Sequence, residues 1–119
     1  MAEIKNMNEE NMTAEPETTE DAAFYTIRLK KPVTYDGEAF DEISFDFSSL
    51  TGADAMNIDD ELSAAGKFVP VAAFSTEYLI RMAAKAAKKP IGADFFKLLC
   101  LSDFEKIKAR ARRFLIDAD

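Results

Sequence analysis

The first regular pattern along the chain is an alternation of apolar and polar residues over residues 24–35. This period of two is typical of a β-strand with one apolar face. A second alternating run covers residues 38–47, and Asp36-Gly37 joins the two runs. Asp-Gly between β-formers indicates a type I′ turn, because both central residues of that turn take positive φ. The pattern therefore predicts a β-hairpin over residues 24–47.

The positions of the large apolar residues in the second run predict a β-bulge. With a two-residue turn and no bulge, the later apolar residues of the second run would pair with polar residues of the first run. One extra residue near Asp41-Glu42, roughly across from Pro32, corrects the register. It places Phe45 opposite Leu29 and Phe47 opposite Ile27, and it gives one apolar face of Ile27, Leu29, Ile43, Phe45 and Phe47.

Helical spacing of apolar residues follows the hairpin, and it predicts three to four α-helices that cover the apolar face. Thr51 and Asp54 resemble a capping box, and Ser75 is a typical N-cap. Ser102 and Glu105 form a second capping box. The predicted helices span about residues 52–65, 75–88, 93–99 and 103–116. The fold class is therefore α+β, with an N-terminal β-hairpin packed on these helices.

Residues 1–22 differ in composition from the rest of the chain. They contain seven acidic side chains and one lysine, without an apolar pattern. Such a segment buries too little apolar surface to offset its ordering entropy, so we expect a disordered acidic tail before a single domain over residues 23–119. The segment has no apolar core of a secretory signal, and no stretch of the chain suits a membrane span. The expected location is the cytoplasm.

The residue inventory argues against catalysis. The chain has no histidine and one cysteine, Cys100, which we interpret as a small buried apolar residue in a reducing compartment. The acidic clusters at Asp41-Glu42 and 59–61 do not match an EF-hand loop, and the four glycines form no phosphate-binding motif. We therefore expect no enzyme activity, no metal site and no cofactor.

Charge is divided unevenly along the chain. The net charge is −7 and the isoelectric point about 4.6, which argues against nucleic-acid and membrane partners. Residues 1–66 carry sixteen acids and four bases, whereas residues 67–119 carry six acids and eleven bases. This division permits contact between copies of the chain, and it also permits neutralisation within one monomer. The basic residues at 106–113 are interpreted as a solvated helix face.

Four segments together resemble a known family. They read IRLKKPVTYDGEAFDEISFDF, LTGADAM, EYLIRMAAKAAKKP and LLCLSDFEKIKARARRFLID. In this order the chain is similar, over about residues 24–116, to the tail assembly chaperones of contractile-tailed, Mu-like bacteriophages and related prophages. The resemblance implies a protein that binds the tape measure protein, keeps that long helical chain soluble during tail assembly, and is absent from the mature virion. It also implies a longer product made by ribosomal frameshifting, and it carries over no catalytic residues.

A chaperone for a helical client needs an apolar groove. The candidate residues lie in the apolar linker after the first helix and on the helices that flank it, where methionine can adapt to varied partners. They are Met56, Phe68, Val69, Val71, Phe74, Tyr78 and Met82. The alternative is that these residues complete the core.

Two other functions stay open from the sequence. A small acidic regulatory or inhibitory protein would use its acidic half to mimic nucleic acid, and its binding would weaken steeply with salt. A minor structural component of the tail would persist in mature particles. The free backbone edge of the hairpin could also pair with a second copy, although Pro32 and two lysines blunt part of that edge.

Overall fold

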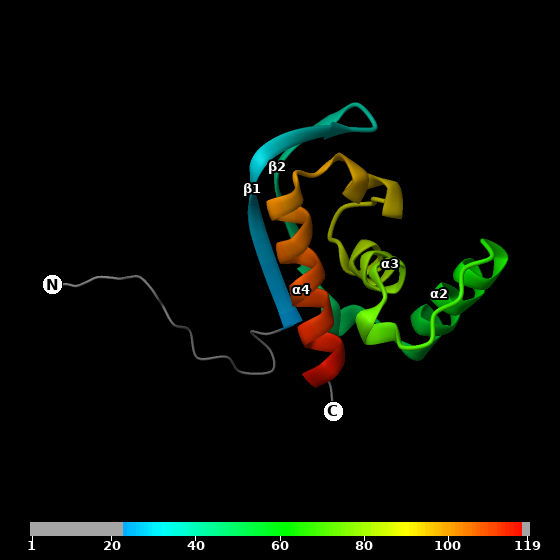
Figure 1. Ribbon diagram of the computed structural model, residues 1–119. Helices are drawn as coiled ribbons and strands as arrows, with labels where there is room; N and C mark the ends of the chain where they lie inside the picture. The colour runs from blue at the N-terminus through cyan, green and yellow to red at the C-terminus, as the bar shows by residue number, and fades with distance from the viewer. Residues whose placement is uncertain (1–22, 118–119) are drawn as a thin grey trace, which may run out of the picture.

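The structure is a computed structural model, and it describes residues 23–117. The predicted acidic tail, residues 1–22, lies outside the described residues. Figure 1 shows the arrangement of the elements, in which η denotes a 3₁₀ helix. In chain order they are β1 (Phe24–Tyr35), β2 (Glu38–Asp46), η2 (Phe47–Ser49), α2 (Gly52–Ala64), η3 (Ala72–Phe74), α3 (Thr76–Ala86), η4 (Ala93–Leu98) and α4 (Leu101–Asp117). The predicted α+β class, a hairpin followed by helices, is confirmed.

The turn of the hairpin forms as its sequence indicates. Asp36 and Gly37 take φ values of 51° and 80°, and Tyr35 pairs with Glu38. Positive φ at both central positions is the type I′ requirement that favours glycine. A two-residue connection therefore fixes the register of the strands nearest the turn.

The predicted position of the bulge is wrong. Arg28 pairs with Glu42 and Val33 with Phe40, so the extra residues lie in β1, beside Pro32, rather than near Asp41-Glu42. The predicted partners differ as well: Phe45 pairs with Tyr25 instead of Leu29, and Ile27 pairs with Ile43 instead of Phe47. Phe47 lies in η2, after the end of β2. The physical reason is that Pro32 has no N–H, while the N–H groups of Lys30 and Lys31 donate to a helix side chain instead of to β2.

The apolar face of the hairpin is buried as predicted. Its five members are at most 6% exposed: Ile27, Leu29, Ile43, Phe45 and Phe47. Phe45 lies 6.5 Å from Phe96 between ring centroids, and Phe95 meets Phe96 edge-on at 5.5 Å. These aromatic rings from the hairpin and η4 form the centre of the core.

The helices form layers away from the hairpin. Figure 1 shows α4 running alongside the hairpin and α3 lying between α4 and α2, in agreement with the contacts between these elements. After α3 the chain meets the hairpin again, where Lys88 N–H donates to the Ser44 carbonyl at 2.9 Å and Ala87 forms a bridge with Phe45. Part of the outer edge of β2 is thereby covered.

The helix caps explain where α2 and α3 begin. Thr51 and Asp54 form the predicted reciprocal capping box of α2. Ser75 Oγ accepts from the N–H of Tyr78 at 3.1 Å, as expected of the N-cap of α3. Each cap satisfies N–H groups that have no partner within the helix.

Two predictions for the C-terminal part need correction. Residues 93–98 form a 3₁₀ helix instead of an α-helix, and α4 begins at Leu101, so Ser102 lies inside the helix rather than at its N-cap. The Cys100 carbonyl instead accepts from Phe104 N–H at 3.0 Å. Cys100 is half-buried, not fully buried as predicted. Asp103, which lies between Ser102 and Glu105 of the expected capping box, accepts hydrogen bonds from the hairpin.

Candidate functional site

Three exposed apolar side chains of the predicted site lie between α2 and α3. Phe68 is 87% exposed, Phe74 is 72% exposed and Val71 is 50% exposed. We call these three residues the linker patch. Scattered apolar residues are ordinary on protein surfaces, but three exposed ones within seven consecutive positions make this stretch a candidate contact surface.

Local backbone structure explains how the linker patch becomes exposed. Gly66 takes φ of 74°, and Lys67 N–H donates to the Leu62 carbonyl at 2.9 Å, which ends α2. The chain then passes through Pro70 into η3, and Arg112 Nε of α4 donates to the Ala73 carbonyl at 2.9 Å. This hydrogen bond attaches the end of the linker to the body of the protein.

The seven predicted site residues do not form one groove. Phe68, Val71 and Phe74 make up the linker patch, and Met56 on α2 is 69% exposed. Val69 is half-buried against the core, while Tyr78 and Met82 are 8% and 3% exposed. The structure thus divides the predicted set into exposed residues and residues of the interior.

Tyr78 and Met82 are nevertheless accessible from one side through an apolar pocket of about 130 Å³. The pocket lies among α2, α3 and the C-terminal part of α4. Its lining comprises Leu50, Thr51, Asp54, Ala55, Ile58, Tyr78, Met82, Phe114 and Leu115. An apolar cavity of about 150 Å³ can hold a benzene molecule, so this pocket has room for a single apolar side chain.

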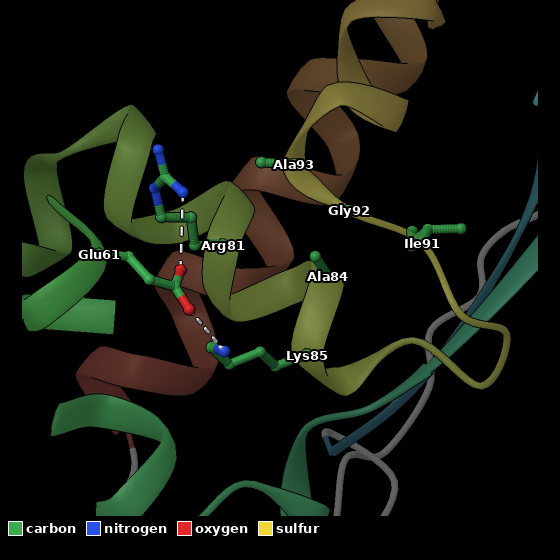
Figure 2. Close-up of a pocket in the computed structure, with 7 residues that line it drawn as sticks. All are labelled: Glu61, Arg81, Ala84, Lys85, Ile91, Gly92 and Ala93. Atoms are coloured by element: carbon green, nitrogen blue, oxygen red, sulfur yellow. Dashed lines mark hydrogen bonds and ion pairs between the residues drawn. The ribbon is translucent and has the colours of Figure 1, made fainter. Parts of the chain in front are cut away.

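A polar pocket of about 190 Å³ lies on another side of α3, and Figure 2 shows its lining. Glu61 of α2 reaches between two cations of α3, with 3.5 Å to Arg81 Nη1 and 3.0 Å to Lys85 Nζ. Ile91, Gly92 and Ala93 form the other wall. Glu77 Oε1 lies 3.5 Å from Arg81 Nη2, so Glu61 and Glu77 together balance the charges of the two cations. We therefore interpret this pocket as a contact that holds α2 on α3.

Asp103 is the buried charged residue that sequence reasoning missed. It is 0% exposed, and its Oδ2 accepts from the N–H of Lys30 at 2.9 Å, from the N–H of Lys31 at 3.4 Å and from Cys100 Sγ at 3.3 Å. Burial acts to raise the pKa of Asp103, but these hydrogen bonds, together with the nearby Lys106 ammonium, outweigh burial and lower the pKa. The residue therefore anchors the bulge of β1 to α4. The feature of the sequence that could have pointed to Asp103 is the presence of an acidic residue in the first turn of the last helix.

Side chains that could bind a metal ion do not cluster in the described part of the chain. Within residues 23–117 no group of three or more His, Cys, Asp or Glu side chains could hold a metal ion. Over the same residues no helix has the length and apolar character needed to cross a bilayer. The chemistry that these residues offer is apolar contact, bordered by charged side chains.

Comparison of the chain with protein-family models, curated proteins and solved structures gives no significant match.

Proposed function

We propose that the protein is a phage or prophage tail assembly chaperone, which binds the tape measure protein and keeps it soluble while the tail assembles. The observation that carries the proposal is the linker patch, with Phe68 the most exposed of its three apolar residues. The resemblance of residues 24–116 to that family supplies the client. The protein would act in the cytoplasm of the bacterial host and would be absent from the mature virion.

The geometry of the linker patch suits a helical client. Amphipathic helices bind through apolar side chains at i, i+3, i+4 and i+7. The patch offers separate contact points along the linker, and the hydrogen bond from Arg112 to Ala73 holds the end near Phe74 in place. A surface that is already ordered costs less entropy on binding than one that must order first.

The proposal is tested by co-expression with the long helical reading frame that encodes the client, followed by pull-down and light scattering. We expect a soluble complex with the wild-type protein and loss of that complex with Phe68→Asp. Since Phe68 is 87% exposed, the midpoint of thermal unfolding should hardly change, because exposed positions shift the unfolding free energy by about 0.5 kcal/mol or less.

Leu101→Asp is the matched control. Leu101 is 73% exposed and lies at the start of α4, away from the linker, so this variant makes the same change of charge and polarity elsewhere. It should bind the client like the wild type. A client that is equally soluble with and without the protein, or that binds Phe68→Asp as well as the wild type, would contradict the proposal.

A second candidate function follows from the outward face of α2, where Asp59 and Asp60 are exposed. A small acidic regulatory protein would use such a face to occupy a basic nucleic-acid channel. The two functions differ in salt dependence, since charge-driven binding weakens steeply with ionic strength whereas apolar binding does not. Binding that survives high salt and fails in Phe68→Asp would favour the chaperone.

A further inference from the structure

The side of α4 that lies next to β1 contains a hollow lined mainly by cations. Its volume is about 230 Å³, and we call it the basic hollow. The lining residues are Tyr25, Lys106, Ala109, Arg110 and Arg113. The set includes three cations and no carboxylate, so the hollow suits an anionic occupant.

The neighbouring carboxylates leave this positive charge largely in place. Asp103, which faces Lys106, is fully buried and already accepts three hydrogen bonds through Oδ2. Asp117 lies 3.9 Å from Arg113, but both side chains are more than 60% exposed, so the pair is weak. The Arg110 guanidinium carbon lies 4.3 Å from the centroid of the Tyr25 ring, which fixes one wall of the hollow.

We propose that the acidic N-terminal segment of the same chain, residues 1–22, docks on the basic hollow. This segment carries seven acidic side chains and one lysine, a net charge of −6. The described structure begins at Ala23, two residues before Tyr25 in the wall of the hollow. The point at which this segment joins the described chain therefore lies close to the cations of the hollow.

Attachment favours this occupant over a second copy of the chain. A group joined covalently to its binding surface through a short linker has an effective concentration in the millimolar range. Separate copies of the chain in dilute solution are far below that concentration. In a second copy of the chain, the exposed residues Asp59 and Asp60 of α2 would compete with residues 1–22 for the basic hollow. Docking in the same chain would screen the basic side of α4 and would be released by salt or by a more acidic partner.

The test is paramagnetic broadening in the full-length protein. A nitroxide is attached to a cysteine introduced by Asn11→Cys, in a background of Cys100→Ser that keeps a hydrogen-bond donor for Asp103. At low ionic strength the amide signals of Ala109 and Arg113 should lose about half their intensity or more, and at about 1 M salt, where the Debye length is near 3 Å, they should recover. Broadening that is absent at low ionic strength would overturn the proposal.

Two comparisons make the test specific. Arg113→Glu should abolish the broadening at Ala109, whereas Lys97→Glu, the same charge reversal at an exposed residue of η4, should not. Mixing nitroxide-labelled protein with separate isotope-labelled protein should give no broadening. If the mixture broadens as strongly as the single chain, the occupant belongs to a second copy and the proposal fails. An equal loss of broadening in Arg113→Glu and Lys97→Glu would also contradict the proposal, because the broadening would then depend on the net charge of the protein and not on the basic hollow.

Discussion

The core beneath the hairpin and the region formed by α2 and the linker use phenylalanine in opposite ways. Phe95 in η4 is 0% exposed and contacts Phe40 and Phe96, with ring centroids at 5.1 and 5.5 Å. Phe68 in the linker is 87% exposed. The same residue type therefore stabilises the fold in one region and is available for binding in the other.

The two regions also differ in how firmly they are held. The buried side chains of α2 are Ile58 and Leu62, whereas α3 buries six, and α2 packs on α3 at the side away from the hairpin. Elements with few buried contacts open more readily than the core. Substitutions in the core and in the linker patch should therefore affect stability and the proposed client binding separately, and the following experiments test that separation.

The largest effect is expected for Phe95→Ala. Removal of this fully buried ring leaves a cavity and should lower the free energy of unfolding by about 3–5 kcal/mol, measured by urea denaturation. Phe68→Ala is the matched change in the linker patch and should stay within about 0.5 kcal/mol of the wild type. Similar losses in the two variants would show that the linker belongs to the core.

An intermediate effect is expected for Asp103→Asn, which removes the charge that accepts from Lys30 and Lys31. The loss should be about 1–3 kcal/mol at neutral pH, because a buried charged acceptor is replaced by a neutral amide. The folded state lowers the pKa of Asp103, so the carboxylate stabilises the protein above the pKa of the unfolded chain. That contribution is lost as the pH falls through the lower pKa of the folded state.

The pH dependence of the unfolding free energy distinguishes the contribution of Asp103 from that of the other carboxylates. The difference in unfolding free energy between wild type and Asp103→Asn should shrink as the pH falls from neutral to below about 4, measured by urea denaturation at each pH. Asp59→Asn, a change on the exposed face of α2, should show a much smaller difference throughout. A constant difference between wild type and Asp103→Asn across the series would refute the assignment.

The local parts of the fold could be predicted from the sequence, and the long-range parts could not. The Asp36-Gly37 turn and the caps at Thr51 and Ser75 depend on neighbouring residues, and these predictions are confirmed. The bulge was assigned to the wrong strand because the acceptor for the N–H of Lys30 is Asp103, which lies 73 positions further along the chain. No periodicity within the hairpin carries that information.

The candidate site shows the same limit. The linker pattern indicated an apolar surface, but it did not separate exposed Phe68 from buried Met82. Burial of Met82 depends on α2 and α4 meeting α3 around the apolar pocket. The exposure of Phe68 depends on the turn at Gly66 and on the path to η3. Both outcomes are decided by where separate elements pack, which residue spacing does not specify.

The smallest effect is expected for Glu61→Gln, and it tests whether α2 opens separately from the core. Glu61 is about 40% exposed, so its ion pairs with Arg81 and Lys85 should contribute only about 0–1 kcal/mol. Amide hydrogen exchange in α2 should accelerate by up to about fivefold, whereas exchange in β2 and α4 should stay unchanged. Asp60→Asn removes a charge from the exposed face of the same helix and is the control. Acceleration that extends to β2 would mean that α2 and the core open as one unit, and the two regions could then not be changed separately.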